Sequence, residues 1–327
     1  MTMVALLGAS GYIGQAFAAE LSRRGIDFLP LSRARVDYTR FDRVLEFCRL
    51  RKPTLLINAA GHTGTPNVEA CEQEQADTLR GNTVFPLTVA QACWVTGVAW
   101  AHISSGCLYA GAKVQWNGGW KTERNLNTPP LRELFASAPE RFRGYVETDP
   151  PNFSFRSPPC SFYSGTKALA EEILATVEGG YIWRLRMPFD EFDHPRNYLS
   201  KLLRYPWIYD NINSLSHRGD FAKACLELWQ RQAPLGIYNI TNPGAVETRA
   251  VIQRIQDILK LPRKFEFWAD DEEFYRLGAR TPRSNCLLDV SKLLAAGVAM
   301  RPVAEAITQA LECWQPEPKL MTGKSIK

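Results

Sequence analysis

The chain has 327 residues, of which 45% are hydrophobic and 22% are charged, and its formal net charge is +5. This composition indicates a globular protein with room for an α/β domain and a smaller lobe, and its dispersed basic residues suit an anionic ligand better than a nucleic acid. The eight cysteines form no Cys-x-x-Cys pair and no apolar run reaches membrane-spanning length, so we expect neither a zinc site nor a membrane protein.

A short apolar strand opens the chain. Residues 4–7 are typical of a buried parallel strand, which ends at Gly8, and an amphipathic helix is predicted from Tyr12 to Arg24. Because this strand begins so early, no signal peptide is expected, and we expect a soluble, cytoplasmic protein.

The glycines after this strand favour a dinucleotide site over an ordinary turn. Glycines let the backbone turn tightly and approach a pyrophosphate, which the free N–H groups and dipole of a helix N-terminus attract. The pattern is Gly-x-x-Gly-x-x-Gly rather than Gly-x-Gly-x-x-Gly, but it lies between a strand and a helix, as this site requires. The residues expected to contact the cofactor here are Gly8, Ser10, Gly11, Tyr12, Ile13 and Gly14.

The residues after the second predicted strand, 27–32, indicate which nicotinamide cofactor is bound. An acidic side chain at this place holds a ribose diol, whereas an arginine holds a 2′-phosphate. The chain has Ser32, Arg33 and Arg35 there. These residues favour NADPH over NADH, the alternative being two arginines that only face solvent.

Helices and strands alternate through the rest of the first half, which predicts a doubly wound parallel sheet, the Rossmann fold, over 1–188. The predicted elements are helices at 41–50 and 76–96 and strands at 54–58, 98–105 and 181–186, the last of which closes the series. Side chains at the carboxyl ends of these strands should lie at the ligand crevice. They are Asn58, Ser104, Ser105 and Cys107.

One stretch, 111–160, does not fit this alternation. It contains a short helix-like segment at 131–135, two tryptophans and many prolines. A long loop inside a compact domain is usually a lid or an interface, the alternative being a solvated surface insertion.

The second half is less regular and predicts a smaller α/β lobe over 189–315. Its predicted elements are helices at 197–204, 220–231, 248–259 and 303–314 and a strand at 236–240. The tail, 316–327, is proline-rich and then basic, which predicts a loose segment.

Tyr163 and Lys167 lie on a helix that is predicted to run to about Val177. Because they are four positions apart, they lie on the same face of this helix. A lysine ammonium beside a phenol favours the phenolate, so the tyrosine can exchange a proton near neutral pH, as an enzyme that makes or unmakes a carbinol requires. The spacing alone is common by chance, but together with the glycine motif it is specific.

With these two motifs the chain resembles the extended short-chain dehydrogenase/reductases that modify nucleotide sugars, over about residues 3–315. It is most similar to the nucleotide-4-keto-6-deoxysugar 3,5-epimerase/4-reductases. The segments that carry this resemblance are 58–69, 161–167, 184–188, 195–197, 238–244 and 282–285. The resemblance implies a Rossmann domain that binds NAD(P), a C-terminal lobe that binds a nucleotide sugar, with UDP or dTDP favoured, and a homodimer formed through the Tyr163 helix.

The resemblance also implies roles for single side chains. Tyr163 would protonate the oxygen of a ketone, Lys167 would bind the nicotinamide ribose and lower the pKa of Tyr163, and Ser105 would hydrogen-bond the same oxygen. Cys107 and Lys201 match the pair that removes and returns protons on the carbons beside the ketone, which the carbonyl acidifies. The alternatives are a packed thiol and a solvated lysine, in which case the chain would be a plain 4-ketoreductase similar to dTDP-4-dehydrorhamnose reductase.

Other positions match binding residues of the same family. Those near the cofactor are Asp37, Asn58, Ala59, Ala60, Gly61, Asn82 and Pro188. Those facing the substrate are Thr63, Thr65, Asn67, Arg196, Asn197 and Arg283, together with Cys107 and Lys201. Arginine suits a diphosphate because it can bind bidentately, the alternative being surface charges.

Two further functions are disfavoured. A 4,6-dehydratase of this family would have an Asp-Glu pair where Gly106 and Cys107 stand. A non-catalytic cofactor-binding protein on this fold would commonly lack Tyr163 or Lys167, and both are present.

Overall fold

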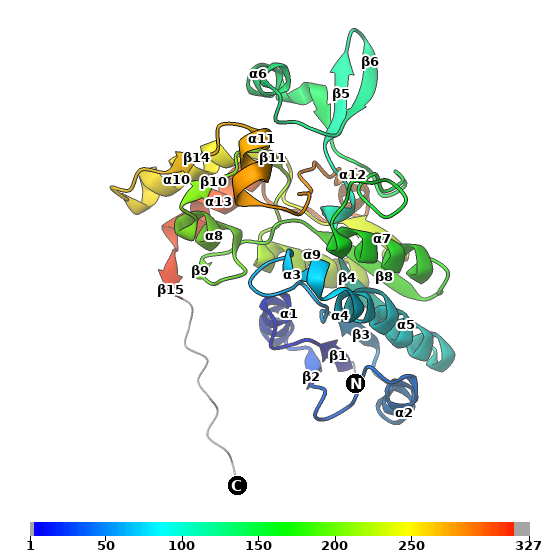
Figure 1. Ribbon diagram of the computed structural model, residues 1–327. Coiled ribbons are helices and arrows are strands. Elements are labelled where there is room, and N and C mark those ends of the chain that lie inside the picture. Colours follow the sequence, from blue (N-terminus) through cyan, green and yellow to red (C-terminus); the bar gives the residue numbers. More distant parts are fainter. Residues whose placement is uncertain (1–2, 317–327) are drawn as a thin grey trace.

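The computed structural model describes residues 3–316 and contains a six-stranded parallel sheet in the order β12-β8-β4-β3-β1-β2 (Figure 1). The strands are β1 Met3–Leu7, β2 Asp27–Leu31, β3 Leu55–Asn58, β4 Ala99–Ser105, β8 Gly180–Leu185 and β12 Gly236–Asn239. The strand order reverses between β1 and β3, and ligands of open α/β sheets bind at the carboxyl ends of the strands at such a point. The predicted Rossmann sheet is confirmed.

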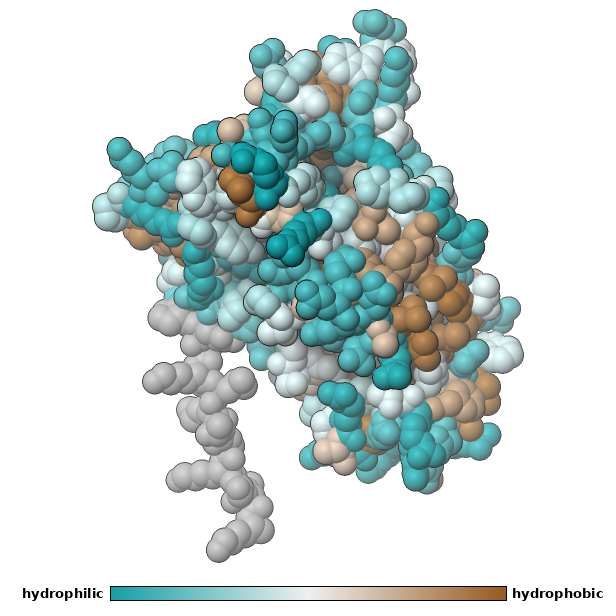
Figure 2. Space-filling view, in the orientation of Figure 1, coloured by the Kyte–Doolittle hydropathy of each residue, from teal (hydrophilic) through white to brown (hydrophobic). Residues whose placement is uncertain are grey.

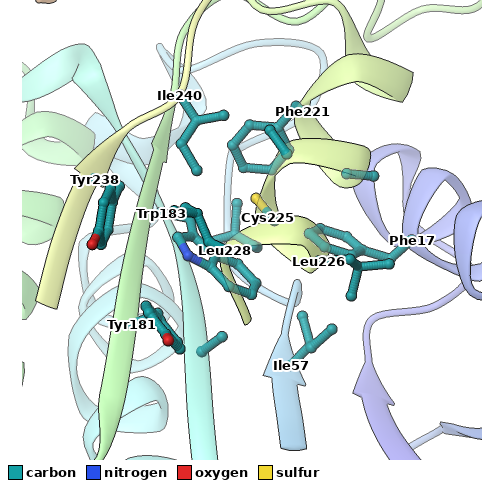
Figure 3. Close-up of a cluster of buried hydrophobic side chains, with 14 of the residues drawn as sticks. Phe17, Ile57, Tyr181, Trp183, Phe221, Cys225, Leu226, Leu228, Tyr238 and Ile240 are labelled. Atoms are coloured by element: carbon teal, nitrogen blue, oxygen red, sulfur yellow. The ribbon is translucent and has the colours of Figure 1, made fainter. Parts of the chain in front are cut away.

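Helices cover both faces of this sheet. One face packs against α1, Tyr12–Arg23, and α9, Arg218–Gln230, and Figure 3 shows Phe17, Trp183 and Phe221 meeting in that layer. The other face is covered by α2 Phe41–Arg51, α5 Phe85–Thr96 and α7 Phe162–Leu174. Apolar side chains alternate between the two layers along β1, as period-two burial on both faces requires.

The predicted strand series is wrong in one respect, because β8 does not close it. β12 pairs with β8 in parallel, with Ile237 opposite Ile182, and extends the sheet by one strand. The chain reaches β12 through α9, which packs on α1, so the crossover brings a segment of the second half back to the sheet. The strand at 236–240 was predicted, but nothing local in its sequence shows which sheet it joins.

The predicted helix over 76–96 is interrupted. α4, Gln75–Leu79, passes into a π-helical turn, Arg80–Val84, before α5 begins. Pro86 lies at the start of α5 and has no N–H to continue the regular ladder. The π turn carries Asn82, whose side chain binds both backbone groups of His62, at 2.9 and 2.8 Å. A short helix not predicted from the sequence, α3 Ala70–Gln73, precedes α4.

The rest of the second half has its own apolar core. That core is formed by α8 Tyr198–Arg204, α10 Thr248–Leu259 and α13 Val303–Glu312, which confirm the predicted helices. The second half also contains shorter elements: β9 Phe192–Asp193, β10 Trp207–Ile208, β11 Ile212–Asn213, β13 Val246–Glu247, β14 Glu266–Phe267, α11 Asp271–Glu273, β15 Gln315–Pro316, and α12 Ser291–Ala295, which packs on β12. Residues 317–327 of the tail that was predicted to be loose lie outside the described residues.

The stretch 111–160 begins with a small subdomain. β5 Ala112–Trp116, β6 Gly119–Glu123 and β7 Phe142–Arg143 form an antiparallel sheet, and α6 Pro129–Ser137 packs beside it. The subdomain projects from the body of the molecule at the top of Figure 1. Val114, Leu131 and Phe142 form its core with Ile212 and Leu287 of the second half, so it is packed against that half of the chain.

Within residues 3–316, no helix is long and apolar enough to cross a membrane.

Candidate active site

The turn after β1 forms a cradle of closely spaced backbone atoms, in which a residue larger than glycine would not fit. Gly8 has φ +72°, and a Cβ on it would lie 2.7 Å from the Ala60 nitrogen. A Cβ on Gly14 would lie 2.0 Å from the Gly8 oxygen. Gly11 begins α1 without a side-chain cap, so the first N–H groups of α1 are left for an anion. Ser10 is exposed beside this turn and Ile13 packs partly into the sheet, and the arrangement fits a pyrophosphate.

Tyr12 turns its side chain away from this cradle. Its hydroxyl donates to Asp190 Oδ1 at 2.8 Å, and its ring stacks on His194 with 4.6 Å between ring centroids. The Arg218 guanidinium lies 4.3 Å from the same ring. Burial, and then the Asp190 charge, raise the pKa of Tyr12 far above its usual range. Only the backbone of Tyr12 is therefore available to a pyrophosphate, while its side chain joins α1 to the second half.

The predicted 2′-phosphate residues are exposed after β2. Within residues 3–316 the guanidinium groups of Arg33 and Arg35 have no hydrogen bond or ion pair, and Ser32 is also exposed. Asp37 accepts a hydrogen bond from Thr39 Oγ1 at 2.6 Å, which helps to hold its pKa below the usual range. Both arginines are thus free to meet a phosphate.

The loop after β3 leads from the cradle to the lysine. Asn58 Oδ1 accepts from the Ala60 N–H at 3.0 Å, which fixes the turn Asn58–Ala59–Ala60. A Cβ added to Gly61 would lie 3.8 Å from Lys167 Nζ and 3.2 Å from Asn82 Oδ1. The predicted cofactor residues of β1, β3, the π turn and α7 therefore line one continuous path.

Ser105, Tyr163 and Lys167 are brought together between β4 and α7. All three side chains are buried, and Lys167 Nζ donates to the Ile103 oxygen at 3.2 Å. Burial lowers the pKa of Lys167 to about 8, with Glu171 acting in the opposite direction.

The pKa of Tyr163 differs from expectation. Burial and then the nearby Cys107 raise it, and a hydrogen bond with Ser105 opposes the rise. We expected Lys167 to favour the phenolate, but the lack of water around this phenol outweighs that effect. The neutral phenol is the form that can donate a proton to a ketone oxygen.

Cys107 lies in a 3-10 turn, Gly106–Leu108, directly after β4. Its backbone N–H donates to Ser105 Oγ at 3.2 Å, and its sulfur accepts a hydrogen bond from Arg186 Nη1 at 3.1 Å. The thiol is partly exposed.

Lys201, on α8, lies in the same neighbourhood. Burial lowers the pKa of Lys201, Arg196 and Arg283 lower it further, and Cys107 acts in the opposite direction. No described residue accepts a hydrogen bond from its ammonium group. The structure therefore gathers Cys107, Lys201 and the two predicted substrate arginines around one site.

The two arginines are tied to the loop that follows β3. Arg196 Nη2 donates to the Gly64 oxygen at 2.8 Å, and Arg283 Nη2 lies 2.8 Å from Glu69 Oε1. On this loop Thr63 and Thr65 are exposed, and Asn67 Oδ1 accepts from the Glu69 N–H.

Asn197 and Pro188 have structural contacts. The Asn197 side chain is fully buried, donates to Asp190 and Phe192, and caps α8 at the Leu199 N–H. The Pro188 oxygen accepts from the Tyr198 N–H at 3.0 Å. These contacts indicate that Asn197 positions the start of α8.

Two buried charged residues at the site were not predicted. Arg186, just after β8, contacts Cys107, and Glu171, one turn after Lys167, binds Arg184 through both carboxylate oxygens. Two arginines in the predicted strand 181–186, whose other residues are apolar, were the available signal, because a buried charge requires partners. Within the described part of the chain, no group of three His, Cys, Asp or Glu side chains could hold a metal ion.

Comparison with known proteins finds relatives that match most of the chain. Residues 1–315 match the family model described as RmlD substrate binding domain. The chain is 30% identical, over 78% of its length and 75% of the relative's, to a bifunctional dTDP-4-dehydrorhamnose 3,5-epimerase/dTDP-4-dehydrorhamnose reductase of Arabidopsis thaliana. It is also 30% identical, over 88% of its length, to a trifunctional UDP-glucose 4,6-dehydratase/epimerase/reductase of the same plant, of which it spans 38%.

Solved structures share the fold. A UDP-rhamnose synthase of Acanthamoeba polyphaga mimivirus has a TM-score of 0.79 and 21% identity, with 95% of this chain and 99% of that one covered. A dTDP-4-dehydrorhamnose reductase of Bacillus anthracis, solved in complex with NADP, has a TM-score of 0.72 and 19% identity, with 95% and 98% covered.

Proposed function

The chain belongs to the RmlD substrate-binding family and is a nicotinamide-dependent oxidoreductase of the short-chain dehydrogenase/reductase type, and we propose that it is an NADPH-dependent nucleotide-sugar 3,5-epimerase/4-reductase. Its substrate would be a nucleotide-linked 4-keto-6-deoxyhexose. One observation carries the epimerase half of this proposal. Cys107 and Lys201 share the neighbourhood of the Ser105–Tyr163–Lys167 trio.

The reductive half uses the buried trio. When bound, the reduced nicotinamide supplies the hydride that reduces the ketone carbon. Tyr163, kept neutral by burial, gives its proton to the ketone oxygen, and Ser105 hydrogen-bonds that oxygen. Lys167 has one described hydrogen-bond acceptor, the Ile103 oxygen, so its other N–H bonds can hold the nicotinamide ribose.

The epimerase half precedes reduction. The Cys107 thiolate takes the proton from a carbon next to the ketone, and the electrons of that C–H bond form an enolate whose oxygen Tyr163 and Ser105 hold. The Lys201 ammonium then gives a proton to the opposite face of the carbon, which restores the ketone. Solvent afterwards returns a proton to Lys201 and removes one from Cys107.

Three finer assignments accompany this proposal. The free guanidinium groups of Arg33 and Arg35 support NADPH rather than NADH. Arg196 and Arg283, beside Lys201, would bind the substrate diphosphate, with UDP or dTDP favoured because the relatives act on substrates linked to these nucleotides.

A homodimer is the third assignment. Exposed apolar side chains lie on the helical turns next to α7 and in the loop before it, and Figure 2 shows a hydrophobic area on the right of the molecule. They are Leu79, Val84, Trp94, Val95 and Phe155. A second copy that packs its α5 and α7 against this patch would remove these side chains from water.

Incubation in D2O separates the two halves. With NADPH and UDP- or dTDP-4-keto-6-deoxyglucose, mass spectrometry should find reduced product that carries two solvent deuterium atoms on carbon. Cys107→Ser should stop deuterium incorporation, yet it should still reduce a ketone that has already been epimerised. Reduced product without solvent deuterium would leave a plain 4-ketoreductase, and no product from either nucleotide would refute the substrate assignment.

A further inference from the structure

Arg186 is a buried cation without a carboxylate partner in the described part of the chain. It is 2% exposed, and its guanidinium donates to Asn213 Oδ1 at 2.7 Å, to the Ser284 carbonyl oxygen and to Cys107 Sγ at 3.1 Å. Arg184, two residues earlier and equally buried, is neutralised by Glu171. A buried charge that nothing neutralises is costly, so the groups around Arg186 that can carry negative charge decide its role.

Those groups are two phenols, Tyr163 and Tyr198, whose pKa values burial raises so that both stay neutral, and two thiols. Cys286 is fully buried and its sulfur donates to the Gly106 oxygen at 3.2 Å. Burial raises the pKa of Cys286 to about 11, so this thiol stays neutral near pH 7. Cys107 differs, because the residue is partly exposed and its sulfur accepts the Arg186 hydrogen bond. It is the sulfur that can carry the compensating charge.

We propose that Arg186 holds Cys107 in the thiolate form and in place, so that Cys107 can act as a base near neutral pH. This inference rests on the proposed epimerase function, and it makes Arg186 a positioning residue that acts through Cys107. A guanidinium beside the sulfur favours the anion, and two fixed contacts, Asn213 and the Ser284 oxygen, keep it there.

Other titratable groups also face Cys107, but none matches this role. Tyr163 and Cys286 are neutral acids at pH 7, and the nearby lysines are Lys167 and Lys201. Burial lowers the pKa of both lysines, that of Lys167 to about 8, so both lose charge as the pH rises. Arg186 stays charged at every pH at which the protein is folded and is the cation that hydrogen-bonds the sulfur.

Stabilising a thiolate has two opposite effects. The fraction of active base at neutral pH increases, whereas the proton affinity and nucleophilicity of each thiolate decrease. Replacing Arg186 should therefore slow Cys107 reactions near neutral pH and leave them as fast or faster at alkaline pH. A residue with only a structural role would slow them at every pH.

Alkylation of the full chain without substrate measures this directly. Iodoacetamide labelling followed by peptide mass spectrometry gives the rate at Cys107 between pH 6 and 10. For Arg186→Met we expect about a tenfold lower rate at pH 7 and a rate equal to that of the unaltered protein by about pH 10. Arg186→Lys keeps a positive charge but cannot contact Cys107 and Asn213 through two separate nitrogens. Its rate at pH 7 should therefore lie between those of Arg186→Met and the unaltered protein. Cys286 should stay unlabelled throughout.

A second variant, Asn213→Ala, tests the proposal even if Arg186→Met does not fold. Asn213→Ala removes one support of Arg186 and leaves its charge, so its alkylation profile should shift in the same direction by a smaller amount. Melting temperature and NADPH binding identify variants that have lost the fold. If Arg186→Met unfolds, Arg186→Lys and Asn213→Ala decide the question. Folded variants whose Cys107 profile coincides with that of the unaltered protein would overturn the proposal.

The exchange of substrate hydrogens with D2O then tests the link to epimerisation. Arg186→Met should incorporate deuterium about tenfold more slowly at pH 7 and recover toward pH 10, while reduction of an already epimerised ketone continues. If the unaltered protein shows the Arg186-dependent alkylation profile but incorporates no deuterium, the epimerase proposal fails and the thiolate assignment stands.

Discussion

At the scale of single residues, the site contains a buried lysine whose pKa is lowered because little water reaches it. Lys167 is 5% exposed, and burial lowers its pKa from 10.5 to about 8. Between these two pH values the unfolded chain holds a proton that the folded chain has released. The free energy of unfolding therefore rises with pH in this window, and the cost of burying the ammonium is complete only below about pH 8.

Lys167→Met should thus stabilise the protein in the absence of cofactor. The shift corresponds to at most about 3 kcal/mol at pH 6, and the gain should shrink as the pH rises from 8 to 10.5. Urea unfolding at pH 6, 8 and 10 measures it. Lys223→Met, at an exposed position on α9, is the control and should show no such pH dependence. A pH-independent gain for Lys167→Met would mean that the methionine acts through packing alone.

The choice of cofactor also belongs to this scale. Arg33→Ala should weaken NADPH binding about tenfold, because a charge-assisted contact to a phosphate is lost, and leave NADH binding unchanged. Fluorescence titration of the two cofactors gives the ratio. Arg40→Ala removes an exposed arginine that is already paired with Asp42 and should change neither Kd. Equal losses for NADPH and NADH would show that Arg33 does not recognise the 2′-phosphate.

The sequence predicts residues of this site when a local spacing carries the chemistry. Tyr163 and Lys167 share a helix face, and Cys107 follows a strand end by two residues. Each could therefore be assigned to the site without knowledge of its contacts in the folded chain. Arg186 could not be placed, because its partners Cys107, Asn213 and Ser284 come from three other segments. The raised pKa of Tyr163 could not be predicted from the sequence either, since it depends on how completely the fold excludes water.

At the scale of elements, α7 is fixed to the sheet by one buried ion pair. Glu171 lies one turn after Lys167 and accepts hydrogen bonds from Arg184 Nη2 at 2.6 Å and Ser104 Oγ at 2.5 Å. Arg184 belongs to β8 and Ser104 to β4, so the pair joins α7 to the two strands beneath it. Lys167 itself donates to the Ile103 oxygen of β4 at 3.2 Å, so both residues hold α7 against the sheet.

Glu171→Gln should destabilise the protein by about 3–5 kcal/mol, because it leaves the buried Arg184 without its countercharge. The next residue offers a matched control. Glu172 pairs with Arg156 in water, with side chains 51% and 79% exposed, and Glu172→Gln should cost less than about 1 kcal/mol. Urea unfolding of the two variants gives the comparison. Similar losses would contradict the role given to the buried pair.

Elements were predictable where burial follows a simple period. The strands with two buried faces and the helices with one apolar face were found from the sequence, including α8, α10 and α13. The π turn before α5 was not, because the turn depends on a distant contact between Asn82 and the His62 backbone. The same limit applies to β12, which the sequence shows as a strand without indicating that it pairs with β8.

At the scale of the whole molecule, the apolar patch beside α7 predicts self-association. Val84→Glu places a charge on this patch, and light scattering should find a dimer for the unaltered chain and a monomer for the variant. Leu235→Glu changes an exposed apolar residue before the edge strand β12 and should leave the dimer intact. A monomer for the unaltered chain at micromolar concentration would refute the dimer.

The projecting subdomain raises a different question, since its sequence predicted a long irregular stretch with one helix-like segment, 131–135, which lies in α6, and did not predict its strands. Its strands pair among themselves, yet Asn125 and Asn127 both donate to Asp271, at 2.7 Å each, far along the chain. Asp271 also accepts the Tyr209 hydroxyl at 2.8 Å. Contacts of this kind cannot be seen in a local pattern, and they connect the subdomain to the segment that leads to Arg283.

That segment continues to Arg283, which we propose binds the substrate. Tyr209 stacks on Phe274 with 3.8 Å between ring centroids, and the neighbouring Tyr275 hydroxyl accepts a hydrogen bond from the Arg283 N–H at 3.1 Å. Asp271 thus lies between the subdomain and a residue assigned to the substrate diphosphate. If the subdomain positions Arg283, loosening Asp271 should weaken substrate binding without affecting the cofactor.

Asp271→Ala should therefore raise KM for the nucleotide sugar about tenfold and leave the Kd for NADPH unchanged, because a small displacement of Arg283 weakens its grip on the diphosphate. Glu272→Ala is the control, since the Glu272 side chain is exposed and makes no hydrogen bond within the described residues. Steady-state kinetics and cofactor titration on both variants give the answer. An unchanged KM for Asp271→Ala would limit the subdomain to a structural role, whereas a matching loss of NADPH affinity would indicate that the whole molecule has loosened.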